Sequence, residues 1–201
     1  MNFLKYGSAE TSYLSKKDIK LGQLISKIGY IKREVYDDLF DSLIGYIATQ
    51  QISNKAAVTV RARIYDKFKI ITAKKLDNAT DEEIQSVGIS MKKVQYMRNL
   101  SRAVLSGELE METLKDFSDD EVKSKLTSIK GIGNWTAEMF LIFSLKRMDV
   151  VSYKDLAIRR GMMSLYGLER LEKKTFERYR ENYSPYGTVA SLYLWSLSKE
   201  I

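Results

Sequence analysis

The sequence predicts an all-α protein, and three observations lead to that prediction. Proline occurs once in 201 residues, at Pro185. The alternation of apolar and polar residues that is typical of a half-buried strand is scarce. Apolar residues instead recur three and four positions apart over most of the chain, which is the spacing of a helix buried along one face. The length suits one domain or two small ones.

The first long helix is expected near residue 39, where two apolar rows run side by side. These rows are Leu39, Leu43 and Ile47, and Phe40, Ile44 and Ala48. Ser53 is placed to cap the next helix. The buried side of that helix would carry Ala56, Ala57, Val60, Ile64 and Phe68.

Local signals mark the later helices. Capping boxes are formed by Thr80 with Glu83 and by Ser118 with Glu121. Ser90 can open a helix that turns Val94, Met97, Leu100 and Val104 inward. Further helices are expected over roughly 134–146, 156–166, 172–182 and 186–199, with Gly167 and Pro185 between them. The segment Lys16–Gly22 reads as loop or strand, and the sequence does not place it.

Charge and missing residue types narrow the function. The 33 Lys and Arg against 26 Asp and Glu give a net charge of +7, which is consistent with a polyanionic partner, although many basic proteins bind no nucleic acid. The absence of cysteine excludes disulfides, thiolate metal sites and a Cys nucleophile. The absence of histidine removes the commonest general base and transition-metal ligand. No apolar run approaches a membrane span and the start MNFLKYGSAE lacks a signal-peptide core, so we expect an intracellular protein without a membrane partner.

The segment 126–139 is the most informative part of the chain. It places Gly131-Ile132-Gly133 between two short amphipathic helices. The glycines allow a tight turn that Ile132 anchors in the core, and the N–H groups at the start of the second helix can then hold a phosphate. Lys130 lies where its ammonium can reach the same backbone. A glycine-stabilised helix connection is the plain alternative, but the basic context favours a DNA-binding hairpin.

Five segments together resemble the helix-hairpin-helix DNA glycosylases, and within them the 3-methyladenine DNA glycosylase II branch. In chain order they are 48–57 (ATQQISNKAA), 88–94 (GISMKKV), 129–138 (IKGIGNWTAE), 149–160 (DVVSYKDLAIRR) and 183–195 (YSPYGTVASLYLW). The combination is specific, whereas no single segment is.

The resemblance implies an all-helical fold of two lobes, with the hairpin and the active site at the interlobe cleft. Residues 1–201 would form one such unit. Its first lobe would combine about 1–38 with 150–201, and its second would span about 39–149 and contain the hairpin. Larger members add an N-terminal β domain, so this chain resembles a compact form. Its expected partner is double-stranded DNA with a damaged base, and we expect it to act as a monomer.

Asp155 is the candidate catalytic residue. It precedes the expected helix 156–166, where its carboxylate can cap the helix and stay ionised. Most such residues only cap, but a cap also orients the carboxylate. By the resemblance Asp155 is the catalytic aspartate, which stabilises positive charge on the deoxyribose as the base departs and helps to orient or activate water. Asp149 and Asp41 are interpreted as surface or structural residues.

Trp135 separates the branches of the family. Members that also cut the strand place a lysine nucleophile at this position, whereas an indole cannot form a Schiff base. The resemblance therefore implies a monofunctional hydrolase that leaves an abasic site. Lys154 adjoins Asp155 but is not at the family's lysine position, and a phosphate contact or plain surface charge is the interpretation for it.

The lesion class follows from what the chain lacks. Without histidine, a site suits bases alkylated at N3 or N7, such as 3-methyladenine and 7-methylguanine, which already carry positive charge and leave readily. Trp135, Trp195 and Met139 are expected to line the base pocket, where the indoles can add cation–π attraction. Large aromatics on helices usually fill cores, which is the alternative for both tryptophans. Glu138 can supply the acid that would protonate a neutral leaving base, or its side chain can simply face solvent.

The remaining candidate contacts concern the duplex. The hairpin contacts are expected from Lys130, Gly131, Ile132, Gly133 and Asn134. Gln51, in the loop before the Ser53 cap, is nominated as the wedge that fills the gap left by the extruded base. Lys92, Lys93, Arg159 and Arg160 are phosphate contacts or solvated surface. No cofactor is required, but the resemblance implies a monovalent cation, Na⁺ or K⁺, held by the backbone of Thr127, Ile129 and Ile132.

Two other functions stay open. The same fold can serve a deaminated or oxidised base, or the chain can be a non-catalytic helix-hairpin-helix module that only binds DNA. Asp155 together with the aromatic positions argues against the binding module, since a phosphate binder needs neither.

Overall fold

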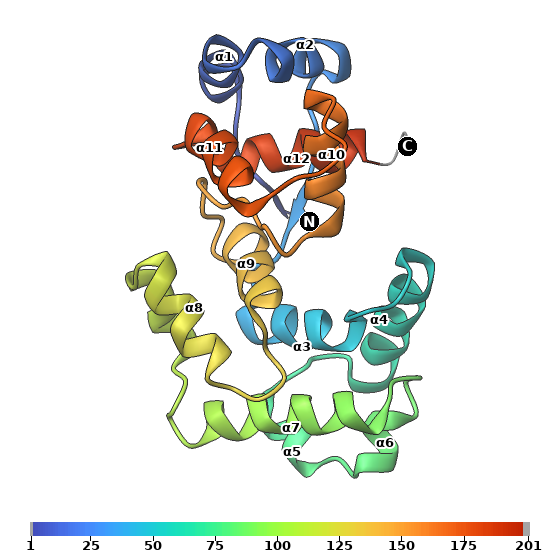
Figure 1. The fold of residues 1–201 in the computed structure, drawn as a ribbon. Helices are drawn as coiled ribbons and strands as arrows, with labels where there is room; N and C mark the ends of the chain where they lie inside the picture. The colour runs from blue at the N-terminus through green and yellow to red at the C-terminus, as the bar shows by residue number, and fades with distance from the viewer. Residues whose placement is uncertain (1, 199–201) are drawn as a thin grey trace. The chain divides into compact units, whose positions relative to one another are not determined.

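A computed structural model describes residues 2–198 of the protein (Figure 1). The prediction of an all-α protein is confirmed, because about 66% of the chain is helical. The described residues contain one strand pair, β1 (Asn2–Phe3) antiparallel to β2 (Glu34–Val35). No helix in the described part is long and apolar enough to cross a membrane.

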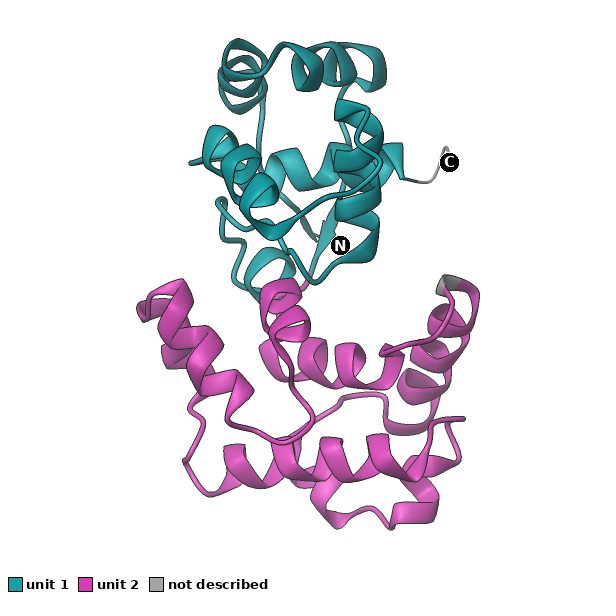
Figure 2. Cartoon of the chain, in the orientation of Figure 1, with its two compact units in different colours: residues 1–35, 141–201 teal, residues 36–140 magenta. Residues whose placement is uncertain are grey.

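The chain divides into two compact units (Figure 2). Unit 1 combines residues 1–35 with 141–201, and unit 2 spans 36–140. The corresponding boundaries expected from the sequence are at about 38 and 149. The second boundary lies inside α9 (Asn134–Phe143), whose last turn belongs to unit 1. A helix that continues across a boundary leaves no loop or linker by which the sequence could mark it.

Unit 1 is built around a buried C-terminal helix. Its helices are α1 (Ser8–Lys17), α2 (Ile19–Ile28), α10 (Leu156–Tyr166), α11 (Lys173–Tyr183) and α12 (Gly187–Leu197). Every residue of α12 from Gly187 to Leu194 is buried. α10 packs closely on α12 because Gly161 has no side chain, and a Cβ there would overlap the carbonyl of Leu194.

The segment Lys16–Gly22 is neither of the two structures that the sequence left open. It forms the end of α1 and the start of α2, with Asp18 between them. The Asp18 carboxylate accepts a hydrogen bond from the N–H of Leu21 at 2.9 Å, which caps α2. Leu21, Leu24 and Ile25 then turn into the core. One capping aspartate between two short helices explains why the local pattern was ambiguous.

Unit 2 contains the helices that surround the glycine turn. They are α3 (Leu39–Thr49), α4 (Asn54–Phe68), α5 (Ala73–Asn78), α6 (Asp81–Gln85), α7 (Met91–Leu105), the 3₁₀ helix η1 (Met111–Asp116), α8 (Asp119–Thr127) and the first part of α9. α3 packs against α4 and α7, and α7 also covers α5 and α6. The apolar rows predicted for α3 are confirmed at Phe40, Leu43, Ile44, Ile47 and Ala48, which are buried, whereas Leu39 at the start of the helix is half-buried.

The predicted caps of unit 2 are confirmed, with one difference. Ser53 accepts a hydrogen bond from the N–H of Ala56 at 3.3 Å. Reciprocal capping boxes form at Thr80, which begins α6, and at Ser118, which begins α8. Ser90 stands at the start of α7 as predicted, but its side chain makes no capping hydrogen bond.

Candidate active site and nucleic-acid interface

Asp155 is the buried N-cap of α10. Its carboxylate oxygen Oδ1 accepts a hydrogen bond from the N–H of Ile158 at 2.9 Å, and the residue is 7% exposed. The N–H of Asp155 itself donates to the carbonyl of Ser152 at 3.2 Å, which turns the chain into the helix. The carboxylate therefore lies at the positive end of the helix and satisfies one of its free N–H groups.

Trp195 orients the same carboxylate. Its indole Nε1–H donates to Oδ1 of Asp155 at 3.1 Å, so that oxygen is held by a backbone donor and a side-chain donor from different helices. The indole also stacks on Phe143, with ring centroids 5.6 Å apart and planes 28° apart. The guanidinium of Arg33 lies 4.5 Å from the Phe143 centroid and 6.0 Å from that of Trp195. Unit 1 thus places an aspartate against an aromatic pair.

The segment that leads to Asp155 is fixed by the start of α12. Asp149 accepts hydrogen bonds from Ser184 Oγ at 2.5 Å and from the N–H of Gly187 at 3.2 Å. Thr188 Oγ1 donates to the carbonyl of Arg147 at 2.6 Å and accepts from the N–H of Val150 at 3.1 Å. These bonds make Asp149 a structural residue. They also tie the chain before Asp155 to the helix that carries Trp195.

The glycine turn forms as predicted between α8 and α9. Ile129 and Ile132 are 5% and 4% exposed, so the turn is anchored in the core of unit 2 from both sides. The N–H of Ile132 donates to the carbonyl of Ile129 at 3.0 Å, and the carbonyl of Gly133 accepts the first helical hydrogen bond, from Ala137, also at 3.0 Å. Gly133 and Asn134 are exposed at the start of α9, where the first N–H groups lack helical partners.

Glycine stands at positions 131 and 133 of the turn for different physical reasons. Gly131 has φ +115°, and a Cβ there would overlap the ring of Tyr96, so the fold itself requires glycine. Gly133 is not in the left-handed region, and apart from Gly133 and its two chain neighbours no described residue has an atom within 4 Å of a Cβ built on it. The fold does not require glycine at 133. A backbone left bare at an exposed helix start permits the close approach of another molecule.

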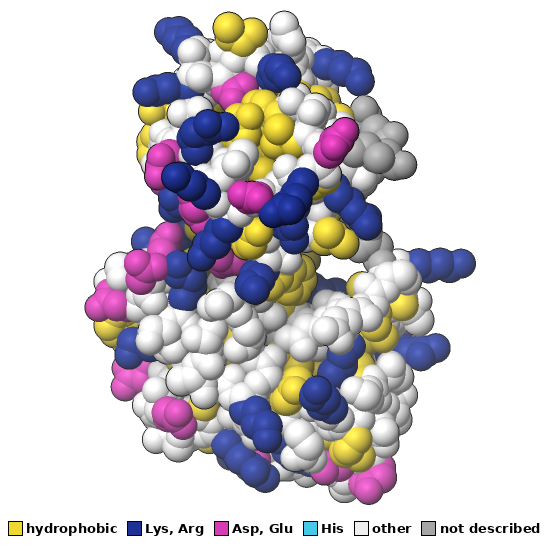
Figure 3. Space-filling model, viewed as in Figure 1, with side chains coloured by type: hydrophobic (Ala, Val, Ile, Leu, Met, Phe, Trp, Pro, Cys, Tyr) yellow, Lys and Arg dark blue, Asp and Glu magenta, His cyan; other side chains and the backbone are white. Residues whose placement is uncertain are grey.

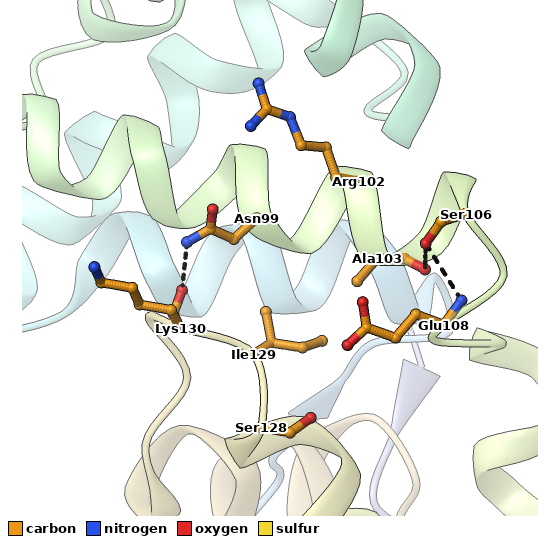
Figure 4. A pocket seen from close by; sticks show the side chains of 8 residues that line it. All are labelled: Asn99, Arg102, Ala103, Ser106, Glu108, Ser128, Ile129 and Lys130. Carbon is orange, nitrogen blue, oxygen red and sulfur yellow. Dashed lines mark hydrogen bonds between the residues drawn. The ribbon is translucent and has the colours of Figure 1, made fainter.

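Side-chain amides hold the carbonyls of the turn. Asn99 Nδ2 donates to the carbonyl of Lys130 at 3.0 Å (Figure 4). Gln50 Nε2 donates to the carbonyl of Gly131 at 3.0 Å and to Thr136 Oγ1 at 3.1 Å. The hairpin backbone is therefore fixed by residues of α7 and by the residue that ends α3.

A pocket of about 290 Å³ lies beside the turn, between the end of α7 and residues 128–130 (Figure 4). Its charged lining residues are Arg102, Glu108 and Lys130. Neither of the two tryptophans nor Asp155 lines it. This pocket is consequently not the expected base pocket.

The other candidate residues of unit 2 lie as follows. Trp135, in the first turn of α9, is half-buried, whereas Met139 is buried at 4% exposure. Gln51 is exposed and has φ +54°, which turns the chain sharply after α3. The carbonyl of Ile129 is one of the expected cation ligands. Its oxygen accepts a hydrogen bond from the N–H of Ile132 through one lone pair. A carbonyl has a second lone pair, so a cation remains compatible with this turn.

The basic candidates divide into exposed and engaged side chains. Lys93 does not reach outward, because its ammonium donates to the carbonyls of Ala48 at 2.8 Å and Gln50 at 2.7 Å, and burial lowers its pKa. Lys92 and Lys154 are exposed. On the face that Figure 3 shows, Lys and Arg side chains are interspersed with acidic ones in both units, so surface charge does not mark one interface.

The predicted site residues divide between the two units. Asp155 and Trp195 are in contact in unit 1, whereas the hairpin, Trp135, Met139 and Gln51 belong to unit 2. Sequence reasoning did not find Gln50, Asn99 or Phe143. Only the QQ pair within ATQQISNKAA offers a signal for Gln50, and the predicted wedge is the neighbouring Gln51.

Comparison with known proteins assigns the family. A family model described as "HhH-GPD superfamily base excision DNA repair protein" matches residues 44–185, which include the hairpin and Asp155. The chain belongs to the HhH-GPD superfamily. The remaining feature of the site, Trp195, lies just beyond the part of the chain that the superfamily model matches.

Individual relatives agree with this assignment. DNA-3-methyladenine glycosylase 1 of Schizosaccharomyces pombe is 35% identical over 84% of this chain and 74% of its own. DNA-3-methyladenine glycosylase of Saccharomyces cerevisiae is 32% identical over 81% of this chain and 67% of its own. Among solved structures, the S. pombe 3-methyladenine DNA glycosylase in complex with abasic DNA has a TM-score of 0.86 at 30% identity, covering 96% and 97% of the two chains. DNA-3-methyladenine glycosidase from Bacillus halodurans has a TM-score of 0.84 at 35% identity, covering 98% and 93%.

Proposed function

We propose that this protein is a monofunctional DNA glycosylase of base excision repair, acting on alkylated purines such as 3-methyladenine and 7-methylguanine. The observation that carries the proposal is the carboxylate of Asp155, buried at the start of α10 and held by both the Ile158 N–H and the Trp195 indole. A cap alone needs only the backbone bond. The second donor, from another helix, fixes the carboxylate in one orientation, as a reacting group requires.

In the proposed reaction the glycosidic bond between C1′ and the base nitrogen breaks, and its electron pair leaves with the base. Positive charge develops on the deoxyribose, and the carboxylate of Asp155 stabilises it. Water then adds at C1′ and loses a proton, which Asp155 can accept. The products are the free base and an abasic site, so atoms and charge balance without a cofactor.

The tryptophan at position 135 supports hydrolysis without strand cleavage. Trp135 stands where lyase members of the superfamily place lysine, and an indole cannot form a Schiff base with the sugar. The two relatives named above are called 3-methyladenine glycosylases, and the pair of Trp195 and Phe143 already holds one cation, the Arg33 guanidinium, at cation–π distance. Cation–π attraction of this kind contributes roughly 1–2 kcal/mol when desolvated.

Double-stranded DNA is the proposed partner. The exposed N–H groups at Gly133 and Asn134 would bind a phosphate, with Lys130 beside them, and the S. pombe neighbour was solved with DNA. The backbone carbonyls of Thr127, Ile129 and Ile132 would hold Na⁺ or K⁺, which would add positive charge near that phosphate. Carbonyl oxygens suit such cations. We further expect an intracellular monomer, whose state size-exclusion chromatography with light scattering would report.

The decisive experiment measures base release from duplexes that carry 3-methyladenine, 7-methylguanine, hypoxanthine, uracil or 8-oxoguanine. We expect release of the two alkylated purines, with strand breaks only after later alkali. Preference for hypoxanthine, uracil or 8-oxoguanine would show that the enzyme acts on deaminated or oxidised bases instead. Strand cleavage without alkali would show that it is not monofunctional. A protein that binds duplex but releases nothing would be a binding module.

Asp155→Asn tests the catalytic assignment. Asparagine caps helices as well as aspartate does, and its amide oxygen can still accept from Trp195, so we expect a stable protein that binds DNA but releases base at least a hundredfold more slowly. Asp38→Asn is the matched control, because Asp38 caps α3 through the same bond, to the N–H of Asp41 at 2.9 Å. Equal activity of the two variants would contradict the role of Asp155.

A further inference from the structure

One face of α7 contacts both the end of α3, directly before Gln51, and the hairpin. Lys93, Tyr96 and Asn99 follow one another at intervals of three residues, which places them in a row along the helix. Lys93 donates to the carbonyls at the end of α3, the ring of Tyr96 occupies the space above Gly131, and Asn99 donates to the carbonyl of Lys130. All of these residues belong to unit 2.

Gln50 joins the same two segments directly. It ends α3, and Lys93 holds its carbonyl at 2.7 Å. Its side-chain amide reaches 81 residues along the chain to Gly131 and also contacts Thr136 in the first turn of α9. The next residue, Gln51, has a φ of +54°, which lies in the left-handed region that non-glycine residues rarely adopt. A strained residue of this kind persists where its surroundings hold it.

We propose that Gln50, braced by Lys93, is a positioning residue that sets the place of Gln51 relative to the DNA-binding hairpin. The proposal rests on the proposed function, in which the hairpin holds the strand and Gln51 fills the gap. A side chain can replace an extruded base only when its distance from the held phosphate is fixed. The Gln50 amide fixes that distance, because the side chain of Gln50 is bonded to the turn at Gly131 while its backbone continues directly into Gln51.

The consequence is specific to extrusion from a paired duplex. Displacement by about 1 Å of a group that positions the substrate can slow a reaction by up to a hundredfold. An unpaired lesion leaves no stacked gap to fill, so its release depends on Asp155 and much less on Gln51. The ratio of release from paired and unpaired substrate therefore separates positioning of the wedge from a general effect on the fold.

The test uses Gln50→Met, which keeps the length of the side chain and removes the amide. We expect release of 7-methylguanine from a paired duplex to fall about tenfold or more, with release from the same lesion in a single strand changed less than about threefold. Gln95→Met is the matched control, because Gln95 also lies on α7 but its amide donates to Asp81 and Met91 instead of to the hairpin. Equal losses on paired and unpaired lesions would overturn the proposal.

A double-mutant cycle with Gln51→Ala tests whether Gln50 affects base release through Gln51. If Gln50 acts through Gln51, the loss from Gln50→Met on the paired duplex shrinks to less than about twofold once Gln51 is alanine. Additive losses would overturn the proposal. Should Gln50→Met fail to fold, Lys93→Met releases the same loop from α7 and is expected to give the same paired-substrate loss.

One arm does not depend on catalysis. In the Asp155→Asn background, 2-aminopurine beside the lesion reports unstacking through its fluorescence. We expect Gln50→Met to reduce this signal on duplex that is saturated with protein, and an unchanged signal would overturn the proposal. If this arm succeeds while the wild type releases no base, the proposed enzymatic function fails and the positioning role stands.

Discussion

At the scale of single residues, Gly131 and Gly133 look alike in the sequence but serve different purposes. Gly131 is required by its φ of +115° and by the ring of Tyr96, whereas Gly133 has open space around the position of a Cβ. We therefore expect Gly131→Ala to lower the free energy of unfolding by about 2–4 kcal/mol. Gly133→Ala should leave stability within about 0.5 kcal/mol and weaken duplex binding about tenfold or more, because the new methyl group obstructs the phosphate.

Chemical denaturation and fluorescence anisotropy measure these two quantities separately. Loss of stability in Gly133→Ala, with unchanged affinity per folded molecule, would show that the glycine serves the fold. Affinity of the wild type should also fall steeply between about 50 and 200 mM salt, since phosphate binding releases counterions.

Trp195 makes two different contacts, since its ring stacks on Phe143 and its indole N–H donates to Asp155. Trp195→Phe keeps an aromatic ring against Phe143 but removes the donor to Asp155. We expect single-turnover base release to slow by about tenfold, with duplex affinity changed less than about threefold. If Trp195 only supplied a hydrophobic wall, phenylalanine would preserve the rate.

At the scale of elements, Arg98 joins the short helices of unit 2. It is 8% exposed, and its guanidinium donates to the carbonyls of Leu76, Asp77 and Ala79 and to the carboxylate of Asp81. Removing these donors leaves the carbonyls at the end of α5 unsatisfied beside a packed helix. Arg98→Met should lower the free energy of unfolding by about 2–4 kcal/mol. Arg102→Met, exposed on the same helix, should change it by less than about 0.5 kcal/mol.

Sequence reasoning succeeded for elements that carry their own local signals. The capping boxes of α6 and α8, and the extent of α10, were predicted because a cap and an apolar face coincide there. It failed at 16–22, where Asp18 ends one helix and begins another within a single residue. It also read Lys93 as a candidate phosphate contact, since no local pattern shows that the end of α3 lies within reach of α7.

At the scale of the whole molecule, buried tyrosines make unit 1 sensitive to alkali. Burial raises the pKa of Tyr6, Tyr166, Tyr183 and Tyr193, all of which lie in unit 1. The folded unit keeps protons that unfolded tyrosines release near pH 10, so this contribution to stability is complete below about pH 10 and is lost as pH rises further. The free energy of unfolding should therefore fall from about pH 10 upward.

Calorimetry between about pH 7 and pH 11 would measure this fall, with tyrosinate absorbance as the local probe. Tyr166→Phe should lower stability at neutral pH, because Tyr166 donates to Asp18 at 2.5 Å, and should flatten the alkaline slope. A slope unchanged in that variant would assign the alkaline loss to other groups. Tyr65, exposed in unit 2, offers Tyr65→Phe as the control.

The sequence by itself determined the helical class, the glycine turn and the choice of Asp155, because each depends on residues close together in the chain. Capping, the 3.6-residue period and the glycine turn are local physics, and the family motifs are contiguous. Only the tertiary structure decided that Trp195 holds Asp155 from another helix, that Gly131 and Gly133 differ, and that Gln50 reaches the hairpin. The hydrogen bonds join residues 40 and 81 positions apart, and the difference between the glycines depends on the space around a backbone atom. A local sequence pattern contains neither kind of information.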